Sequence, residues 1–366
     1  MTADTAAAFM PRWASPPGAT LNDILHERNM TPAGLAEEIG VEKSAIEGLL
    51  TGDLRITVAL ARLLSESVGA SVEFWLSRDA YYREDLERAA ADRWASAFPV
   101  RQMASLGWIP SPSDWKEQLE ICREFFNVSS LHDWEVRTKP ILTAAYFRTA
   151  ETESQRSMGV LAWLRQAEIV AEPQAIGQWQ AAKFRAALEQ ARRLTRERNP
   201  SRFVPALTSL CAASGVRLAV VQSPQRCRVS GAARTFAGSP LITLSARYLT
   251  DDHFWFTFFH EAAHVLLHHN NAVFVDDDDE LRANQGSSAE HEANLFAEQI
   301  LVPGGLHGAG LSQWSSTREV IRKAQQLGVS PGILAGQMQY KGMARYDSHN
   351  GLKRRYKWVG ANLEMA

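Results

Sequence analysis

The chain has 366 residues, which is enough for two or three domains with hydrophobic cores of their own. Its formal net charge of −2 and its 45% of hydrophobic residues are those of an ordinary soluble protein, so bulk charge indicates neither a nucleic acid nor a membrane as partner. No apolar run approaches the roughly 18 residues that a transmembrane helix needs, and we expect no membrane partner.

The cysteines and the N-terminus bear on the cellular compartment of the protein. Cys122, Cys211 and Cys227 are odd in number and lack metal-ligand spacing, which favours reduced structural thiols in a cytoplasmic protein. The first residues have no basic region ahead of an apolar segment, so we do not interpret them as a secretory signal. We predict that residues 1–17 form a flexible tail.

Residues 18–79 contain five short helical patterns. Thr31 is a helix cap before Pro32, Gly40 ends that helix, and a short turn leads to the next pattern, Glu42 to Leu50. The stretch from Thr31 to Val41, followed by Ile46, Gly52, Ile56-Thr57 and Phe74-Trp75-Leu76, resembles the XRE-type helix-turn-helix of phage repressors and antitoxin regulators. The resemblance implies that the helix at 42–50 lies in the major groove of DNA.

The charge of this domain departs from the pattern of a DNA-binding protein. Residues 21–79 carry five Lys/Arg against ten Asp/Glu, and phosphate neutralisation supplies most non-specific DNA affinity. Thr31, Lys43, Ser44 and Arg55 are the candidate DNA-contacting residues. Equal weight falls on the alternative, in which the domain forms a homodimer or docks another protein.

Residues 80–200 are predicted to form a helical middle domain and residues 201–345 a catalytic domain. The helical segments of the middle domain are 81–97, 115–126, 159–171 and 179–198. In the catalytic domain a helix over 204–214 precedes three strands, at 216–221, 228–236 and 241–244. The predicted fold class is therefore mainly α (α+β), with a small three-stranded sheet against which a peptide substrate could lie.

A zinc-binding pattern follows the strands. Residues 260–264 are His-Glu-Ala-Ala-His inside a long apolar helical run, so His260 and His264 share one helix face and Glu261 lies beside them. A catalytic zinc ion takes three protein ligands and leaves a fourth position to water. We therefore predict that His260 and His264 bind one Zn²⁺, with Mn²⁺ or another divalent ion as the alternative, and that Glu261 is the general base.

The third ligand is expected on the helical stretch from Glu290 to Leu301. Glu290 and Glu292 are the two candidates, and they point about 160° apart around a helix. We favour Glu290 because its face continues through Ala293 and Ala297, whose small side chains let two helices approach closely. Asn294 shares this face and is expected to support a ligand from outside the metal's own shell.

Three further features accompany the site. Tyr248, Arg234 and His253 are candidate donors to the oxyanion of a peptidase reaction. Residues 270–289 contain a run of acidic residues and are predicted to form a loop near the cleft, either simply solvated or acting as a gate or cover. Residues 346–366 are predicted as a basic-aromatic tail, which either contacts nucleic acid or packs on the protein.

The pentapeptide at 260–264, combined with Glu290, Ala293, Phe296-Ala297 and Leu301-Val302-Pro303, resembles the ImmA/IrrE family of bacterial metallopeptidases. With the XRE-like front end, the whole chain resembles regulator-peptidase fusions. The resemblance implies zinc on His260, His264 and Glu290 with Glu261 as base. It also implies cleavage of a partner XRE-type repressor in a stress, DNA-repair or mobile-element response.

Two functional hypotheses result. In the first, the protein is a regulated cytoplasmic zinc endopeptidase whose activity depends on a trigger. In the second, it is a DNA-binding transcriptional regulator or antitoxin-like protein, and its peptidase fold is a sensor or a structural module.

Overall fold

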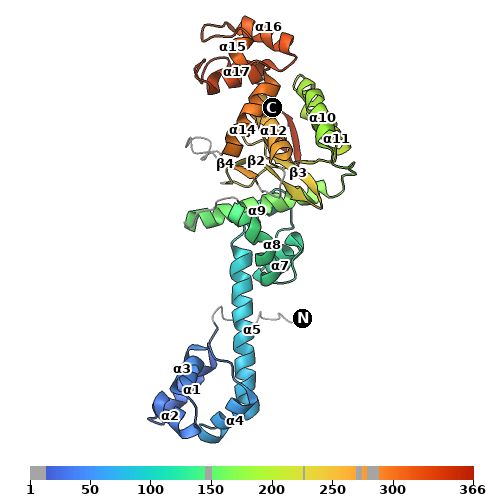
Figure 1. The fold of residues 1–366 in the computed structure, drawn as a ribbon. Coiled ribbons are helices and arrows are strands. Elements are labelled where there is room, and N and C mark those ends of the chain that lie inside the picture. Colours follow the sequence, from blue (N-terminus) through green and yellow to red (C-terminus); the bar gives the residue numbers. More distant parts are fainter. Residues whose placement is uncertain (1–13, 145–150, 226, 269–273, 278–287) are drawn as a thin grey trace, which may run out of the picture. The chain divides into compact units, whose positions relative to one another are not determined.

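The computed structural model describes residues 14–144, 151–225, 227–268, 274–277 and 288–366, and the mainly α (α+β) fold is confirmed (Figure 1). Contacts divide the chain into two compact units, Met1–Ser96 and Ala97–Ala366. The predicted flexible tail lies almost wholly outside the described residues. Among the described residues, no helix is long and apolar enough to cross a membrane.

The first unit is helical and has its own hydrophobic core. Leu21, Leu35, Ile46, Leu64 and Trp75 are among its buried residues. Its helices are α1 (Pro17–Glu27), α2 (Pro32–Ile39), α3 (Lys43–Thr51), α4 (Val58–Ser67) and α5 (Val72–Ser96).

The turn between α2 and α3 is built from the signals that the sequence carries. The Thr31 hydroxyl accepts a hydrogen bond from the Gly34 N–H at 3.0 Å, which caps α2. Gly40 ends α2 in the left-handed conformation, with φ 71°, which a residue without Cβ adopts at low cost.

Helix α5 differs from the prediction. A separate helix was expected at 81–97, with a domain boundary between residues 79 and 80, but one helix runs without a break from Val72 to Ser96. The joining residues contain no glycine or proline. Asp79, which is buried, also pairs with Arg83 one turn later at 3.4 Å.

The second unit is built around a mixed sheet. Its strands are β1 (Arg217–Val220), β2 (Val229–Phe236), β3 (Ser239–Leu244) and β4 (Phe274–Asp277). The strand order is β1-β3-β2-β4, with β1 and β3 parallel and the other neighbours antiparallel.

Strand β4 is a correction to the prediction, because it lies in the segment that was expected to be a loop. A strand joins a sheet through backbone hydrogen bonds, which do not depend on the side chains. The acidic side chains of this segment therefore gave no signal of a strand. Residues 278–287, which hold the rest of the acidic run, lie outside the described residues.

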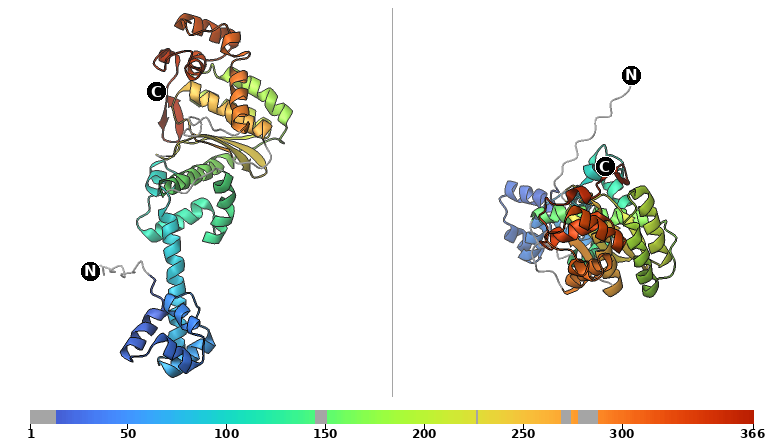
Figure 2. Two further views of the ribbon diagram at one scale, coloured as in Figure 1. Left: turned by 60° about the vertical axis from the view of Figure 1, so that its left-hand side comes forward. Right: turned by 90° about the horizontal axis from the view of Figure 1, so that it is seen from above.

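Helices cover both faces of the sheet (Figure 2). On one face, α9 (Glu151–Ala171) packs Trp163 and Leu164 among sheet residues such as Ala232. On the other face, α12 (Asp251–Leu267) packs Phe254 and Phe258. Successive residues of a strand point to opposite faces, so Ala232 faces α9 and Ala233 faces α12.

The remaining helices surround this core. The predicted helix at 115–126 agrees with the structure, those at 179–198 and 204–214 shift by a few residues, and that at 159–171 begins earlier. The bounds are α6 (Val100–Ser105), α7 (Trp115–Phe126), α8 (Leu131–Ala144), α10 (Ala181–Leu194), α11 (Pro200–Ala213), α14 (Ser288–Leu301), α15 (Gly305–Gly308), α16 (Thr317–Leu327) and α17 (Pro331–Tyr340). All three cysteines are free and buried.

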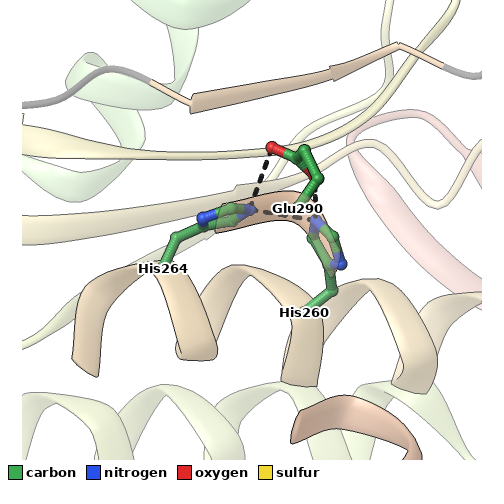
Figure 3. A group of neighbouring side chains, drawn as sticks. All are labelled: His260, His264 and Glu290. Carbon is green, nitrogen blue, oxygen red and sulfur yellow. Dashed lines mark hydrogen bonds and ion pairs between the residues drawn. The ribbon is translucent and has the colours of Figure 1, made fainter. Parts of the chain in front are cut away.

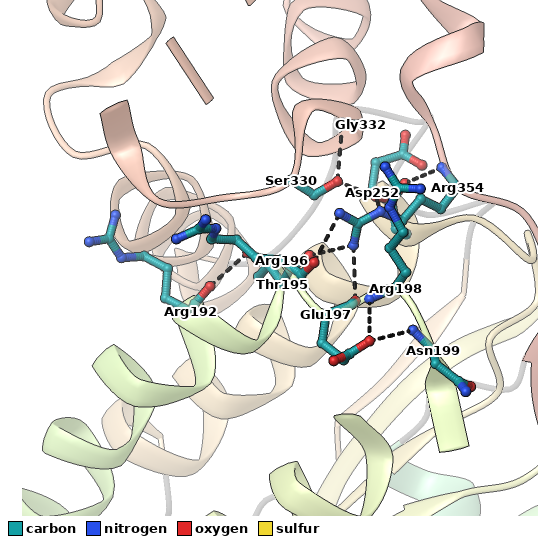
Figure 4. Close-up of polar contacts among 11 residues, drawn as sticks. Arg192, Thr195, Arg196, Glu197, Arg198, Asn199, Asp252, Ser330, Gly332 and Arg354 are labelled. Atoms are coloured by element: carbon teal, nitrogen blue, oxygen red, sulfur yellow. Dashed lines mark hydrogen bonds and ion pairs between the residues drawn. The ribbon is translucent and has the colours of Figure 1, made fainter. Parts of the chain in front are cut away.

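The predicted C-terminal tail is an ordered part of the second unit. A short 3-10 helix, η1 (Asn350–Leu352), precedes a hairpin of β5 (Tyr356–Val359) and β6 (Asn362–Met365). The Arg354 guanidinium donates hydrogen bonds to the carbonyls of Thr195 and Glu197, at 2.8 and 2.9 Å, beyond the end of α10 (Figure 4). Lys353 pairs with the nearly buried Asp252 at the start of α12, at 2.6 Å. This segment therefore packs on the protein and positions α12.

Replacing Lys353 tests this anchor. Lys353→Met is expected to lower the free energy of unfolding by about 3 kcal/mol, because the Asp252 carboxylate stays buried without its cation. Urea unfolding followed by circular dichroism measures the change. Lys357→Met, at an exposed position of the hairpin that follows Lys353, is the matched control and should unfold like the wild type. Equal unfolding curves for the two variants would show that the ion pair does not anchor α12.

Candidate metal centre

The helix α12 holds the two histidines in a fully packed position. Thr250 precedes it, and Asp251 and Asp252 in its first turn complement the positive end of the helix dipole. His260 and His264 are 1% and 2% exposed, although histidine is usually only partly buried. Their spacing of four residues brings both imidazoles to one face, where the Nε2 atoms lie 3.0 Å apart.

Glu290 reaches the same point from α14. Its carboxylate oxygens lie 3.0 Å from the Nε2 of His260 and 3.3 Å from the Nε2 of His264 (Figure 3). Ala293 and Ala297, both fully buried, form the face of α14 that packs in the core, as expected for a close helix approach. The three side chains are the one group of potential metal ligands found among the described residues.

Glu292, the other candidate, lies elsewhere. Its carboxylate is 3.7 Å from the Nε2 of His268 and accepts a hydrogen bond from the Ser288 hydroxyl, and its side chain is about half exposed. Two residues along a helix correspond to a rotation of about 200°, which leaves the two side chains about 160° apart. Helix α14 therefore cannot present both glutamates to one point.

Asn294 orients one of the histidines. Its Oδ1 lies 3.0 Å from the Nδ1 of His260, and an amide oxygen can only accept, so Nδ1 carries the proton. The lone pair of Nε2 then points toward His264 and Glu290. This is the arrangement that a metal-binding histidine uses, with its second nitrogen held by a neighbouring group.

The donor set fits a zinc ion. Tetrahedral zinc with bonds of about 2.1 Å to nitrogen and oxygen separates neighbouring ligand atoms by roughly 3.4 Å. The three separations here are 3.0, 3.0 and 3.3 Å, so little movement is needed to accommodate the ion. Two imidazoles and one carboxylate also suit zinc better than calcium or magnesium, which prefer ligand sets made of oxygen atoms alone.

The charges of the ligands favour metal binding at neutral pH. Burial raises the pKa of Glu290, but the two imidazoles that face it, His260 and His264, outweigh burial and hold that pKa well below its usual range. Burial lowers the pKa of His264 and outweighs the opposite effect of Glu290. Glu290 is therefore a carboxylate and His264 a neutral imidazole, the forms that bind a metal ion.

Glu261 lies under strand β2, against a residue that sequence reasoning missed. A Cβ at Gly231 would overlap the Oε1 of Glu261 and lie 2.7 Å from both its Cγ and the Cγ2 of Thr257. Glycine is therefore required for the strand to approach the fully buried glutamate so closely. A glycine inside a strand is a signal of such an approach, and it was available in the sequence.

The three predicted oxyanion donors do not join the cluster. Arg234 points to the opposite face of the sheet, where it pairs with Glu168 of α9 at 2.8 Å and donates to the Leu164 carbonyl. His253 lies seven residues before His260, about 10 Å along the helix axis. Tyr248 stacks on His253 with ring centroids 4.2 Å apart, so both lie two helical turns from the ligands.

A family model described as the IrrE N-terminal-like domain, Peptidase_M78, matches residues 224–337. The match runs from the segment before β2 into α17 and so includes α12, α14 and the whole His-His-Glu group. No curated protein matches the chain. The family match and the His-His-Glu cluster together support a metallopeptidase-type domain at residues 224–337.

Asn294 should tune metal affinity. Asn294→Ala is expected to weaken zinc binding about 10- to 100-fold, because His260 loses the group that fixes its tautomer and ring orientation. Competition with a chromogenic zinc chelator measures the dissociation constant. Gln299→Ala, at an exposed position of the same helix, is the control, and an equal affinity in both variants would remove Asn294 from the site.

Proposed function

We propose that the second unit is a zinc-dependent endopeptidase. His260, His264 and Glu290 hold the ion, and Glu261 is the general base. The convergence of the three ligand side chains within 3.0 to 3.3 Å, from two separate helices, is the observation that carries the proposal.

The chain's own groups have defined roles in this proposal. A zinc ion supplies a Lewis acid that polarises the attacking water and the substrate carbonyl. Glu261, on the helix that carries both histidines, accepts the proton of the water and passes it to the leaving amine. Asn294 keeps the His260 imidazole in its ligand orientation.

Strand β4 is the proposed docking edge for the substrate backbone. Asp276 of β4 is paired with Gly231 of β2, and Gly231 lies against Glu261, so β4 is the strand next to the one that covers the base. Among the described strands, β4 pairs only with β2. An extended peptide can add to such an edge through backbone hydrogen bonds alone.

We infer that the protein substrate is an XRE-type repressor, in line with the resemblance of the first unit to that class. The acidic first unit would recruit the repressor by pairing with its helix-turn-helix domain. Deletion of the first unit, residues 1–96, should then abolish repressor cleavage while bound zinc stays at one ion per chain.

The experiment combines the purified zinc-loaded protein with repressors encoded beside its gene, and mass spectrometry identifies the products. Glu261→Gln is the control for a contaminating protease. One defined cut, absent with Glu261→Gln, is expected. Intact repressor under every condition tried, with cells carrying Glu261→Gln behaving like the wild type, would refute the peptidase proposal.

The alternative, a DNA-binding regulator, has a separate test. In α3, Lys43 pairs with Glu47 at 2.9 Å, so part of the positive charge expected to face phosphate is already neutralised. A gel shift on the protein's own promoter at about 50 mM salt, where phosphate contacts are strong, tests DNA binding directly. A salt-dependent shift, lost in Lys43→Glu, would favour the alternative.

A further inference from the structure

A cavity separate from the metal centre lies beyond the ends of the central strands. Its volume is about 330 Å³. Its described lining comes from residues 222–225 and 227–228, between β1 and β2, from Ser245, Arg247 and Leu249 after β3, and from Trp358 of β5. We call it the Arg247 cavity. None of the proposed metal ligands lines it.

The Arg247 cavity has a positive lining. Arg228 and Arg247 both line it, and its other polar side chains are neutral amides, hydroxyls and a thiol. The described lining contains no aspartate or glutamate. Arginine presents a planar fork of donors that matches a carboxylate or a phosphate, so the lining suits an anionic group.

The backbone and neighbouring rings fix the position of Arg247. Ala246 and Leu249, on either side, adopt left-handed conformations with φ 50° and 53°, which are unfavourable for residues with a Cβ. The Arg247 guanidinium lies over the Tyr248 ring, 5.3 Å from its centroid, and Tyr248 in turn stacks on His253. The arginine is thus held by a row of side chains that ends on α12.

This row leads toward the proposed base. Arg247 also lines a small recess that it shares with His253 and Thr257. Thr257 packs beside Glu261 under the same residue of β2, Gly231. His253 precedes His260 by about 10 Å along the helix, and three residues of extended peptide span the same length.

We propose that the Arg247 cavity is a specificity subsite that receives an acidic side chain of the peptide substrate, about three residues from the scissile bond. The inference rests on the proposed endopeptidase function and adds a substrate class to it. Arg247 lines both the cavity and the recess, and Thr257 of the recess packs beside Glu261. This proximity to the proposed base favours a side chain of a bound peptide over a free anion.

Extended fluorogenic peptides test the subsite. In a series, Glu replaces Gln at each position from four residues before to four residues after the cleaved bond. The zinc-loaded full-length protein should cleave the peptide with Glu at the third or fourth position on one side about 10-fold faster, in kcat/KM, than its Gln counterpart. Arg247→Gln should reduce this ratio to about one, and Arg318→Gln, an exposed arginine on α16, should leave it unchanged. Equal kcat/KM for Glu and Gln at every position would overturn the proposal, as would a ratio that survives Arg247→Gln.

A binding measurement separates this inference from the proposed activity. Fluorescence anisotropy with Glu261→Gln compares the Glu and Gln peptides without any cleavage. If the wild type cleaves nothing, the endopeptidase proposal fails, while tighter binding of the Glu peptide that disappears in Glu261→Gln/Arg247→Gln still supports the subsite. Millimolar inorganic phosphate serves as the free-anion probe. The proposal is overturned if both peptides bind equally and phosphate raises the thermal unfolding temperature of the protein with Arg247 but not that of Arg247→Gln. The cavity would then be assigned to a small anion.

Discussion

The zinc-loaded protein with Glu261→Gln is expected to keep one zinc ion per chain and to lose about 10²- to 10⁴-fold in kcat/KM, the usual contribution of a general base. Glutamine has nearly the shape of glutamate but cannot accept the proton of the water. His264→Ala should instead lose the ion, because only two ligand side chains remain. Metal analysis by mass spectrometry and a peptide cleavage assay measure the two effects.

His268→Ala is the matched control for these variants. His268 lies one turn after His264, but its Nε2 faces Glu292 at 3.7 Å and it does not belong to the ligand group. It should keep both zinc and activity. Full zinc content in His264→Ala, or unchanged cleavage by Glu261→Gln, would contradict the assigned roles.

The second large effect is expected at Gly231. In Gly231→Ala the new methyl group overlaps the Glu261 carboxylate and Thr257, so the base must move away from its position under β2. A displacement of about 1 Å in a reacting group costs roughly 100-fold in rate, and we expect a loss of that size in kcat/KM. Zinc should stay bound, because the three ligand side chains are not displaced directly.

Ala232→Val is the control for overpacking. It adds a larger volume one residue further along the same strand, but Ala232 faces α9 on the other side of the sheet. It should lower the free energy of unfolding by about 1–3 kcal/mol and leave kcat/KM nearly unchanged. A Gly231→Ala enzyme as active as the wild type would show that the close contact between β2 and Glu261 is not needed.

The helical positions of the site were predictable because they depend on local spacing. The pattern at 260–264 places two imidazoles on one helix face wherever that helix lies in the protein. The same holds for Glu290 and Asn294, which share a face of α14, and the structure brings both to the histidines. Caps and glycine stops, such as Thr31 and Gly40, likewise act within one helical turn.

The choice between Glu290 and Glu292 needed the tertiary structure, because it depends on how α14 is rotated against α12. Arg234 shows the same limit: its residue type suits an oxyanion donor, but strand alternation sends it to the face covered by α9. The edge strand β4 was also hidden, because its pairing uses backbone groups that every residue possesses.

The sequence by itself thus determined which side chains share a helix face, and with them a candidate metal centre on α12 and α14. Only the tertiary structure decided which strand covers Glu261, why Gly231 must lack a side chain, and that the C-terminal segment anchors the start of α12. The physical reason is distance along the chain. Helix periodicity acts over a few residues, whereas strand order, sheet faces and buried ion pairs join residues tens to hundreds of positions apart.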